Sequence, residues 1–319
     1  MYDSINFRLP QERVPSTDLL AEIPVCFDEG SYAEHYGINP FDGKEELRAI
    51  TGRLGNLNVS VNECGVSVKN SLCKWYLGDN YKTLSRGDTQ RAIEKLSDTL
   101  HLPMQEANVT RVDFGTTLIL QHPVNTYFAH LGTLNHYRNR LTQTNGLYYS
   151  NGYSKLAFYD KNKEQKQAGE IIPDLYKGKN VARYEIRYLK RLPKHLGVPE
   201  VTGGLLYDAE FYRVLLDRWH STYANINKLN DFVLNMDVLT TKEQFKKAGL
   251  LLLIEKQGGE VAMLEQIDTA KQQGKLTRKQ ASDIKQMIKS AGTAGELVTP
   301  NEDVAELSRK VSDVKHFFS

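Results

Sequence analysis

Two acidic side chains and one tyrosine stand out in this chain, because each lies in a short segment that alternates apolar and polar residues. The segments span residues 110–113, 156–161 and 183–187. Side chains two apart in a β-strand share a face. By this parity Asp113, Tyr159 and Glu185 each lie opposite the apolar residues of their own segment. We therefore expect the three side chains to meet on the solvent-facing side of one sheet.

The carboxylates of Asp113 and Glu185 suit a divalent metal ion. Hard cations such as Mg²⁺ and Mn²⁺ prefer carboxylate oxygen, and they often take only one or two protein ligands plus substrate phosphate. Such an ion would polarise a phosphodiester as a Lewis acid. The alternative is a set of surface salt bridges with nearby arginines, namely Arg111, Arg183 and Arg187. On spacing alone, salt bridges are the more common arrangement.

Tyr159 is a candidate nucleophile. A phenol has an unperturbed pKa of about 10, so it needs a metal, a base or nearby cations before it attacks. Lys155 lies on the same strand face, and Lys161 and Lys163 follow Tyr159 closely. The alternative is an ordinary half-buried tyrosine, which on residue type alone is the commoner case in a chain with 17 tyrosines.

Charge is concentrated around these residues. The net charge is only +2, yet the stretch from Lys155 to Lys194 holds eleven Lys or Arg and five Asp or Glu. A basic stretch around a candidate site suits a phosphate-bearing ligand, and the alternative is a solvated helix face.

The flanking pattern predicts the elements that position the site. Residues 57–61 and 65–69 alternate as a hairpin, and the spacing predicts a helix from Thr89 to His101 with Asp88 as its N-cap. Residues 127–141 also have a helical pattern. Beyond about residue 205 the pattern is helical and includes a basic helix at 275–289. We therefore expect an approximate domain boundary between residues 200 and 240.

Composition excludes several classes of protein. No apolar run approaches the ~20 residues of a membrane span, and the N-terminal residues lack a signal-peptide pattern. The three cysteines have no Cys-x-x-Cys spacing, which argues against a disulfide framework or a thiolate zinc site. We expect a cytoplasmic protein with reduced cysteines. No phosphate-binding Gly-x-x-x-x-Gly-Lys loop, metal-binding histidine pair or Gly-x-Ser-x-Gly elbow occurs.

Taken in order, the motifs resemble those of the rolling-circle replication initiators of the filamentous-phage gene II and gene X type, which are akin to the Rep_trans plasmid initiators. An Arg-Val-Asp strand (111–113) precedes a Tyr-x-Lys strand end (159–161) and an Arg-aromatic-Glu-x-Arg strand (183–187). Upstream, residues 71–80 resemble the family's Ser-Leu-x-Lys…Gly-x-Asn stretch. The resemblance covers roughly residues 1–205 and leaves the last third unmatched.

The resemblance implies an α+β fold, an HUH-like antiparallel sheet with flanking helices. It implies a nicking and joining domain over 1–205. The remaining residues, 206–319, are expected to form a helical region that the resemblance does not cover, and the basic helix in that region is a candidate for contacts with duplex DNA. Tyr159 matches the family's nucleophile, and Lys161 is the second catalytic residue expected. The acidic matches are Asp113 and Glu185 as ligands of Mg²⁺ or Mn²⁺, and Glu164 is either a third ligand or a helix residue. The cations expected to position DNA are Arg111, Lys155, Arg183 and Arg187.

The activity implied is the nicking of one strand of origin DNA, at a single-stranded or hairpin site with flanking duplex, through a covalent 5′-phosphotyrosine. Host helicase and polymerase would then extend the free 3′ end, with no membrane involved. Two alternatives stay open, a conjugative relaxase with the same chemistry and a non-cleaving DNA-binding regulator of copy number. A tyrosine recombinase would need a His-x-x-Arg motif, which is absent from the sequence.

Overall fold

We describe the protein from a computed structural model, which covers residues 1–14, 20, 23–228, 233–292, 297–299 and 301–318. The chain forms two compact units. The first comprises Met1–Asn125, Leu134–Asn225 and Val311–Ser319, and the second comprises Thr126–Thr133 and Ile226–Lys310. Within the described ranges, no helix has the length and apolar character needed to cross a membrane.

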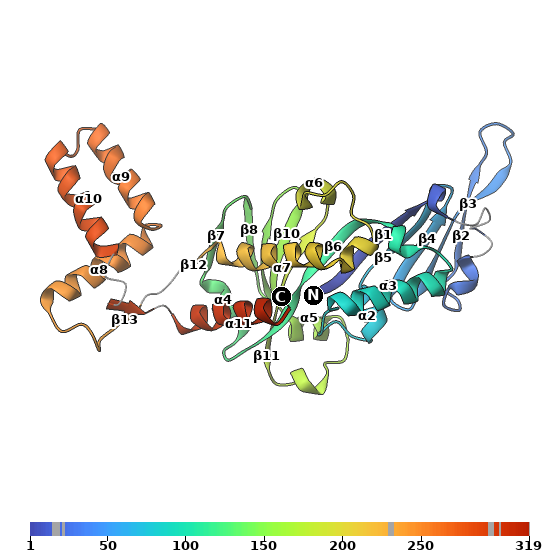
Figure 1. The fold of residues 1–319 in the computed structure, drawn as a ribbon, viewed down its shortest axis with the longest axis horizontal. Helices are drawn as coiled ribbons and strands as arrows, with labels where there is room; N and C mark the ends of the chain where they lie inside the picture. Colours follow the sequence, from blue (N-terminus) through green and yellow to red (C-terminus); the bar gives the residue numbers. More distant parts are fainter. Residues whose placement is uncertain (15–19, 21–22, 229–232, 293–296, 300, 319) are drawn as a thin grey trace. The chain divides into compact units, whose positions relative to one another are not determined.

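Ten strands of the described chain form one antiparallel sheet in the order β2-β3-β4-β5-β1-β6-β11-β10-β9-β8 (Figure 1). Their bounds are β1 Tyr2–Pro10, β2 Ala33–Ile38, β3 Glu45–Leu54, β4 Leu57–Asn62, β5 Gly65–Lys69, β6 Asn108–Leu120, β8 Asn139–Gln143, β9 Gly146–Ser150, β10 Ser154–Asp160 and β11 Asn180–Tyr188. The long central strands are β1, β6, β10 and β11. The α+β class expected from the sequence is confirmed, with helices flanking an antiparallel sheet.

The α-helices of the sheet unit are α2 Leu72–Leu77, α3 Arg86–Leu100, α5 Lys161–Gln167, α6 Leu192–Leu196 and α7 Ala209–Ala224. The 3-10 helices are η1 Gln11–Arg13, η2 Ile23–Cys26, η3 Met104–Glu106, η4 Asp174–Tyr176 and η5 Gly204–Tyr207. The remaining elements are α4 Val124–Ala129, β7 Leu131–Leu134, β12 Ile226–Lys228, β13 Val233–Leu234, α8 Lys242–Lys256, α9 Glu260–Gln272, α10 Arg278–Gly292, β14 Val298–Thr299 and α11 Glu302–Phe318.

One face of the central strands forms the apolar core. Phe158 of β10 stacks on Tyr184 of β11 with ring centres 4.4 Å apart. Tyr184 lies 4.7 Å from the Trp219 ring of α7, and its hydroxyl donates to the Trp219 carbonyl at 2.8 Å. Burial of these large rings is a main source of stability. The sheet unit therefore extends past residue 205, because α7 supplies the cover for this face.

Local signals in the sequence located several elements well. The hairpin predicted at 57–69 is β4 and β5, paired from Asn58 with Lys69 to Asn62 with Gly65. The helix predicted at 89–101 begins earlier, at Arg86, with Ser85 as its N-cap. Asp88 is the third helical residue and completes a capping box, in which each side chain bonds the other residue's backbone N–H.

The helix predicted across 127–141 is wrong. α4 ends at Ala129, and the chain then forms β7 and β8. β8 pairs with β9, and β7 pairs with β12 from a distant part of the sequence. These strand pairings provide backbone hydrogen bonds that local helical preference cannot anticipate, because propensity is only a weak prior against tertiary context.

Candidate active site

Neighbouring strands bring the three polar segments together. β6, β11 and β10 are adjacent in the sheet, and Asp113 pairs directly with Arg187 while Arg183 pairs with Tyr159. Glu185 is two residues from each arginine and so shares their face. The common face predicted by the alternation is therefore present.

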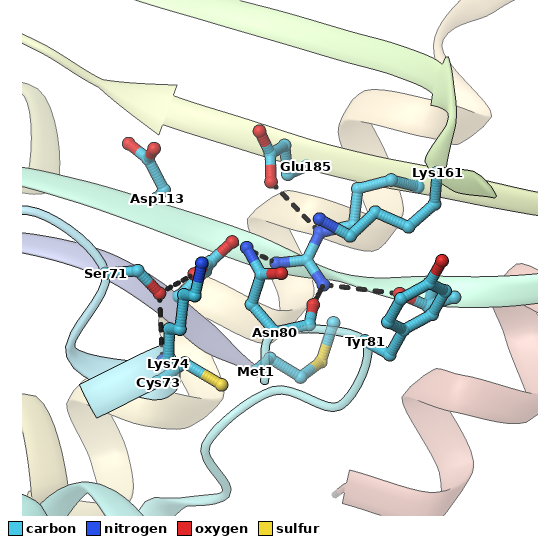
Figure 2. Close-up of polar contacts among 12 residues, drawn as sticks. Met1, Ser71, Cys73, Lys74, Asn80, Tyr81, Asp113, Lys161 and Glu185 are labelled. Atoms are coloured by element: carbon cyan, nitrogen blue, oxygen red, sulfur yellow. Dashed lines mark hydrogen bonds and ion pairs between the residues drawn. The ribbon is translucent and has the colours of Figure 1, made fainter. Parts of the chain in front are cut away.

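This polar face is not open to water, and the expectation of a solvent-facing surface was wrong. The exposed fractions are 3% for Asp113, 2% for Glu185, 7% for Tyr159 and 0% for Arg183. The segment before α3 and the start of α5 lie close by, and Tyr81 and Lys161 from these elements are themselves buried (Figure 2). Alternation identifies a face, but it does not reveal which distant segment covers it.

Arginines bind both acidic side chains. Arg111 donates from Nε and Nη2 to the two oxygens of Asp113 at 2.8 and 2.6 Å. Glu185 accepts from Arg183 Nε at 3.0 Å and from Arg187 Nε at 2.6 Å. Arg187 Nε also lies 3.9 Å from Asp113 Oδ2. The salt bridges considered from the sequence are therefore present, in buried rather than surface form.

The two carboxylates differ in their titration. Burial raises the pKa of Asp113 to about 6; the Arg111 hydrogen bonds oppose this rise and the charge of Glu185 adds to it. Burial also acts to raise the pKa of Glu185, but the charges of Arg187 and Arg183 outweigh it and hold that pKa below its usual value. Glu185 is therefore ionised at neutral pH, and of the two carboxyls Asp113 has the pKa nearer to neutrality.

Asp3 is a third buried carboxylate of this network, and the sequence analysis missed it. Its Oδ2 accepts from Arg183 Nη2 at 2.7 Å, and its Oδ1 accepts from the Ser71 hydroxyl at 2.5 Å. Strict alternation groups Asp3 with the apolar Ile5. A β-bulge between Tyr2 and Ile5 shifts the register, so that Tyr2 and Ile5 both pair with apolar residues of β6. The extra residue puts Asp3 on the polar face.

The Ser71 to Asn80 motif has a structural role beneath this network (Figure 2). Ser71 caps α2 by accepting from the Lys74 backbone N–H at 3.0 Å. Gly78 ends α2 with φ of +87°, a left-handed conformation that glycine adopts without strain. The chain then turns so that the Asn80 carbonyl accepts from Arg183 Nη1 at 3.3 Å. The motif thus supports the guanidinium that joins Asp3 to Glu185.

Tyr159 lies where the buried network meets a surface depression. The depression has a volume of about 570 Å³ and is lined by Thr142, Gln143, Thr144, Asn145, Tyr148, Tyr159, Asp160, Glu164 and Gln167. The Arg187 guanidinium carbon lies 6.0 Å from the centre of the Tyr159 ring. Burial, followed by the charge of Glu185, raises the pKa of Tyr159 well above its ordinary value. The phenol is therefore protonated at neutral pH in the absence of substrate.

The lysines near Tyr159 occupy different environments. Lys161 is buried, donates from Nζ to Glu164 Oε2 at 2.8 Å, and lies 5.7 Å from the centre of the Tyr81 ring. Lys155 Nζ lies 4.3 Å from the centre of the Tyr148 ring, at the wall of the depression. Burial and then the charge of Arg187 lower the pKa of Lys155.

Three of the four cations expected to bind DNA are partly exposed. The side chains of Arg111 and Arg187 keep 34% and 26% of their surface, and Lys155 is half-buried. Arg183 differs, because it is fully enclosed by the network. Its guanidinium is bonded to Asp3 and Glu185 and has no exposed surface.

A comparison with models of known protein families assigns the chain to a family. The family model for the N-terminal part of the phage gene II replication-associated protein matches residues 1–211. The chain belongs to this family of phage replication initiators. The resemblance drawn from its motifs is thereby confirmed. A solved structure described as a rolling-circle replication initiator protein from Geobacillus stearothermophilus is similar to it, with a TM-score of 0.37 and 14% identity over 71% of this chain and 84% of that chain. No curated protein matches.

The family match covers the whole site of this gene II-type initiator. Asp3, the Ser71 to Asn80 motif and the network from Arg111 to Arg187 all lie within residues 1–211. α8, α9 and α10 lie beyond the matched segment. The family therefore accounts for the sheet unit, and the role of the second unit has to be inferred from its own residues.

The carboxylate oxygens of the initiator are the donor type that a hard divalent ion prefers, but they do not form a three-ligand site. Within the part of the chain that the structure describes, no three His, Cys, Asp or Glu side chains are placed to hold an ion. Asp113 and Glu185 share Arg187, whereas Glu164 lies at the depression with 44% of its side chain exposed. A pair of carboxylates completed by substrate phosphate fits the preferences of Mg²⁺, provided that the arginines exchange the carboxylates for phosphate.

Proposed function

We propose that this initiator nicks and rejoins one strand of origin DNA through a covalent 5′-phosphotyrosine on Tyr159. Family membership supports a role in starting rolling-circle replication. One structural observation carries the catalytic proposal. Tyr159 is the tyrosine at which a depression large enough for a nucleotide meets a buried set of arginines and carboxylates.

Arg187 is the residue best placed to hold the scissile phosphate. It contacts Glu185, lies close to Asp113 and Tyr159, and keeps part of its surface exposed. A guanidinium can bind two phosphate oxygens at once and neutralise the charge that develops during attack. Arg111, also partly exposed, is the second candidate for a phosphate contact. Neither contact reads sequence, because phosphate contacts position the strand and base contacts specify it.

The chemistry balances without a nucleotide cofactor. The Tyr159 phenol oxygen bonds to the phosphorus, the bond from phosphorus to the 3′ oxygen breaks, and that oxygen leaves as a 3′ hydroxyl. The phenol gives up one proton and the leaving oxygen takes one. Glu164, which lines the same depression and is held by Lys161, is the carboxylate positioned to accept the phenolic proton. Rejoining is the reverse reaction, so the phosphodiester bond energy is conserved.

Asp113 and Glu185 are the residues that would hold a divalent ion, Mg²⁺ or Mn²⁺, once DNA phosphate engages Arg187 and Arg111. The chemistry that such an ion supplies when bound is Lewis-acid polarisation of the scissile phosphate. Host helicase and polymerase would act after nicking, on the 3′ hydroxyl that the reaction releases.

The test uses supercoiled plasmid carrying DNA of the protein's own replicon, with Mn²⁺ present. We expect wild-type protein to convert the plasmid to open circles and to form a protein–DNA adduct that survives detergent. Tyr159→Phe should abolish both products while DNA binding persists, because the ring stays and only the attacking oxygen is lost. EDTA should suppress nicking in the wild type.

Tyr148→Phe is the matched control, because Tyr148 lines the same depression on the neighbouring strand. It should retain most activity. Adduct at wild-type levels in Tyr159→Phe would reassign the nucleophile, and peptide mapping of the adduct would identify the tyrosine used. Binding of origin DNA without nick or adduct in the wild type would instead support the non-cleaving copy-number regulator.

A further inference from the structure

The second unit contains a small helical core of its own. α8, α9 and α10 pack around buried residues that include Ala248, Leu251, Ile254, Ile288 and Ala291. α10 contributes one apolar face to this core, because Ala281, Ile288 and Ala291 lie on a single stripe at helical spacing and are buried. The opposite face of α10 is consequently turned towards solvent.

The outer face of α10 is polar and suited to hydrogen bonding. Lys279, Ser282, Gln286 and Ser290 recur at helical spacing and are exposed. Asp283 and Met287 are exposed beside them. Amide, hydroxyl and ammonium groups of this kind bond to base edges and phosphates in the grooves of DNA. An amphipathic helix that lies on a membrane needs a free apolar face instead, and the apolar face of α10 is already buried.

Positive charge gathers where α10 begins. Lys271, Lys275, Arg278 and Lys279 are all exposed, and residues 269–282 contain no Asp or Glu. Two other lysines of this unit form ion pairs, Lys246 with Glu243 and Lys285 with Asp268. Within the described ranges, no ion pair or hydrogen bond involves the side chain of any of these four residues.

The backbone adds to this positive potential. Thr277 caps α10 by accepting from the Gln280 backbone N–H at 3.2 Å, and Gln280 accepts in return from the Thr277 backbone N–H at 2.9 Å. This capping box fixes the first turn of a fifteen-residue helix. The positive end of the helix dipole therefore lies among the four cations, where it favours an anionic partner.

We propose that α10 and the turn before it form a duplex-DNA binding surface, with the four cations on phosphates and the outer face of α10 in a groove. DNA is the occupant that charge complementarity favours in a replication initiator. The surface adds affinity for duplex beside the nick site and takes no part in cleavage. It therefore does not depend on the assignment of Tyr159.

The test compares two full-length variants that remove the same number of charges. The first replaces Lys271, Lys275, Arg278 and Lys279 with Gln. The control replaces the exposed α8 residues Lys242, Lys246, Lys247 and Lys256 with Gln. The probe is a fluorescent 30-base-pair duplex of mixed sequence, titrated by anisotropy over a series of salt concentrations. Circular dichroism checks that both variants keep the helix content of the wild type.

We expect the first variant to bind the duplex about tenfold or more weakly than the control, and the slope of log affinity against log salt to fall by about 3 to 4. Cleavage of a single-stranded oligonucleotide carrying the nick site should match the control, which separates this proposal from the nicking assignment. Equal affinity and equal salt slopes in the two variants would overturn the proposal. The alternative partner of these cations would then be an acidic protein surface.

Discussion

Replacing Arg183 with Met tests the buried network most directly. Arg183 has no exposed surface, and its guanidinium bonds Asp3 at 2.7 Å and Glu185 at 3.0 Å. Met has a similar shape and no charge, so the substitution leaves two buried carboxylates short of a partner. Breaking a buried ion pair costs about 3–5 kcal/mol. Because Glu185 keeps Arg187 and Asp3 keeps Ser71, we expect a loss of about 3 kcal/mol in the free energy of unfolding.

The loss should depend on pH. In the wild type the pKa of Glu185 is held below its usual value. Its contribution to the free energy of unfolding is therefore fully present above the unfolded pKa of about 4.3, and it declines as the pH falls below that value. In the variant, the loss of Arg183 removes one of the charges that lower the pKa of Glu185, so that pKa should rise towards its unfolded value. The stability of the variant should therefore depend less on pH in this range. The difference between the two proteins should thus be largest near neutrality and shrink towards about pH 4.

Urea unfolding followed by tryptophan fluorescence measures this change in the relevant part of the molecule, because Trp75 and Trp219 both belong to the sheet unit. Asp3→Asn is the companion variant for a double-mutant cycle. The double variant should be less destabilised than the sum of the single variants by about 1–3 kcal/mol. A loss below about 1 kcal/mol for Arg183→Met, or a loss that does not change with pH, would refute the view that Arg183 neutralises buried charge.

Two further predictions concern Asp113 and Arg187. Burial raises the pKa of Asp113 to about 6, above its unfolded value of about 3.9, so its contribution to the free energy of unfolding should fall as pH rises between these values. Asp113→Asn should remove that decline, as urea titrations across this pH range would show, and an unchanged pH dependence would contradict the assignment. Arg187→Lys keeps the charge but loses the planar fork, so nicking should slow by about 10- to 100-fold with little change in duplex affinity. Equal nicking rates would remove Arg187 from the phosphate-binding role.

The sequence predicted the faces of the central strands with little ambiguity. Arg111 and Asp113, Ala157 and Tyr159, and Arg183 to Arg187 all follow a two-residue period, and that period fixes which side chains share a face. The predicted N-cap at Asp88 was close but wrong, because Ser85 caps α3 and Asp88 completes the same capping box. Motif order across residues 1–205 was enough to indicate the family.

The burial of this face and its contacts with distant segments were beyond the reach of the sequence. The start of β1 and the Ser71 to Asn80 stretch are far from β11 along the chain, yet both bond the Arg183 side chain. Asp3 reached the polar face only through a bulge, which adds a residue that no periodic pattern encodes. The segment 127–141 was misassigned partly for a related reason, because β7 pairs with the distant β12, whereas β8 pairs with the neighbouring β9.

The amino-acid order by itself determined which side chains of each central strand face the same way, because that property depends on backbone geometry between near neighbours. Only the folded chain decided that this polar face would be covered and that Asp3 would join its arginines and carboxylates. Those outcomes depend on contacts between residues up to 180 positions apart, and charge pairing at such separations is set by how the sheet and its covering loops assemble.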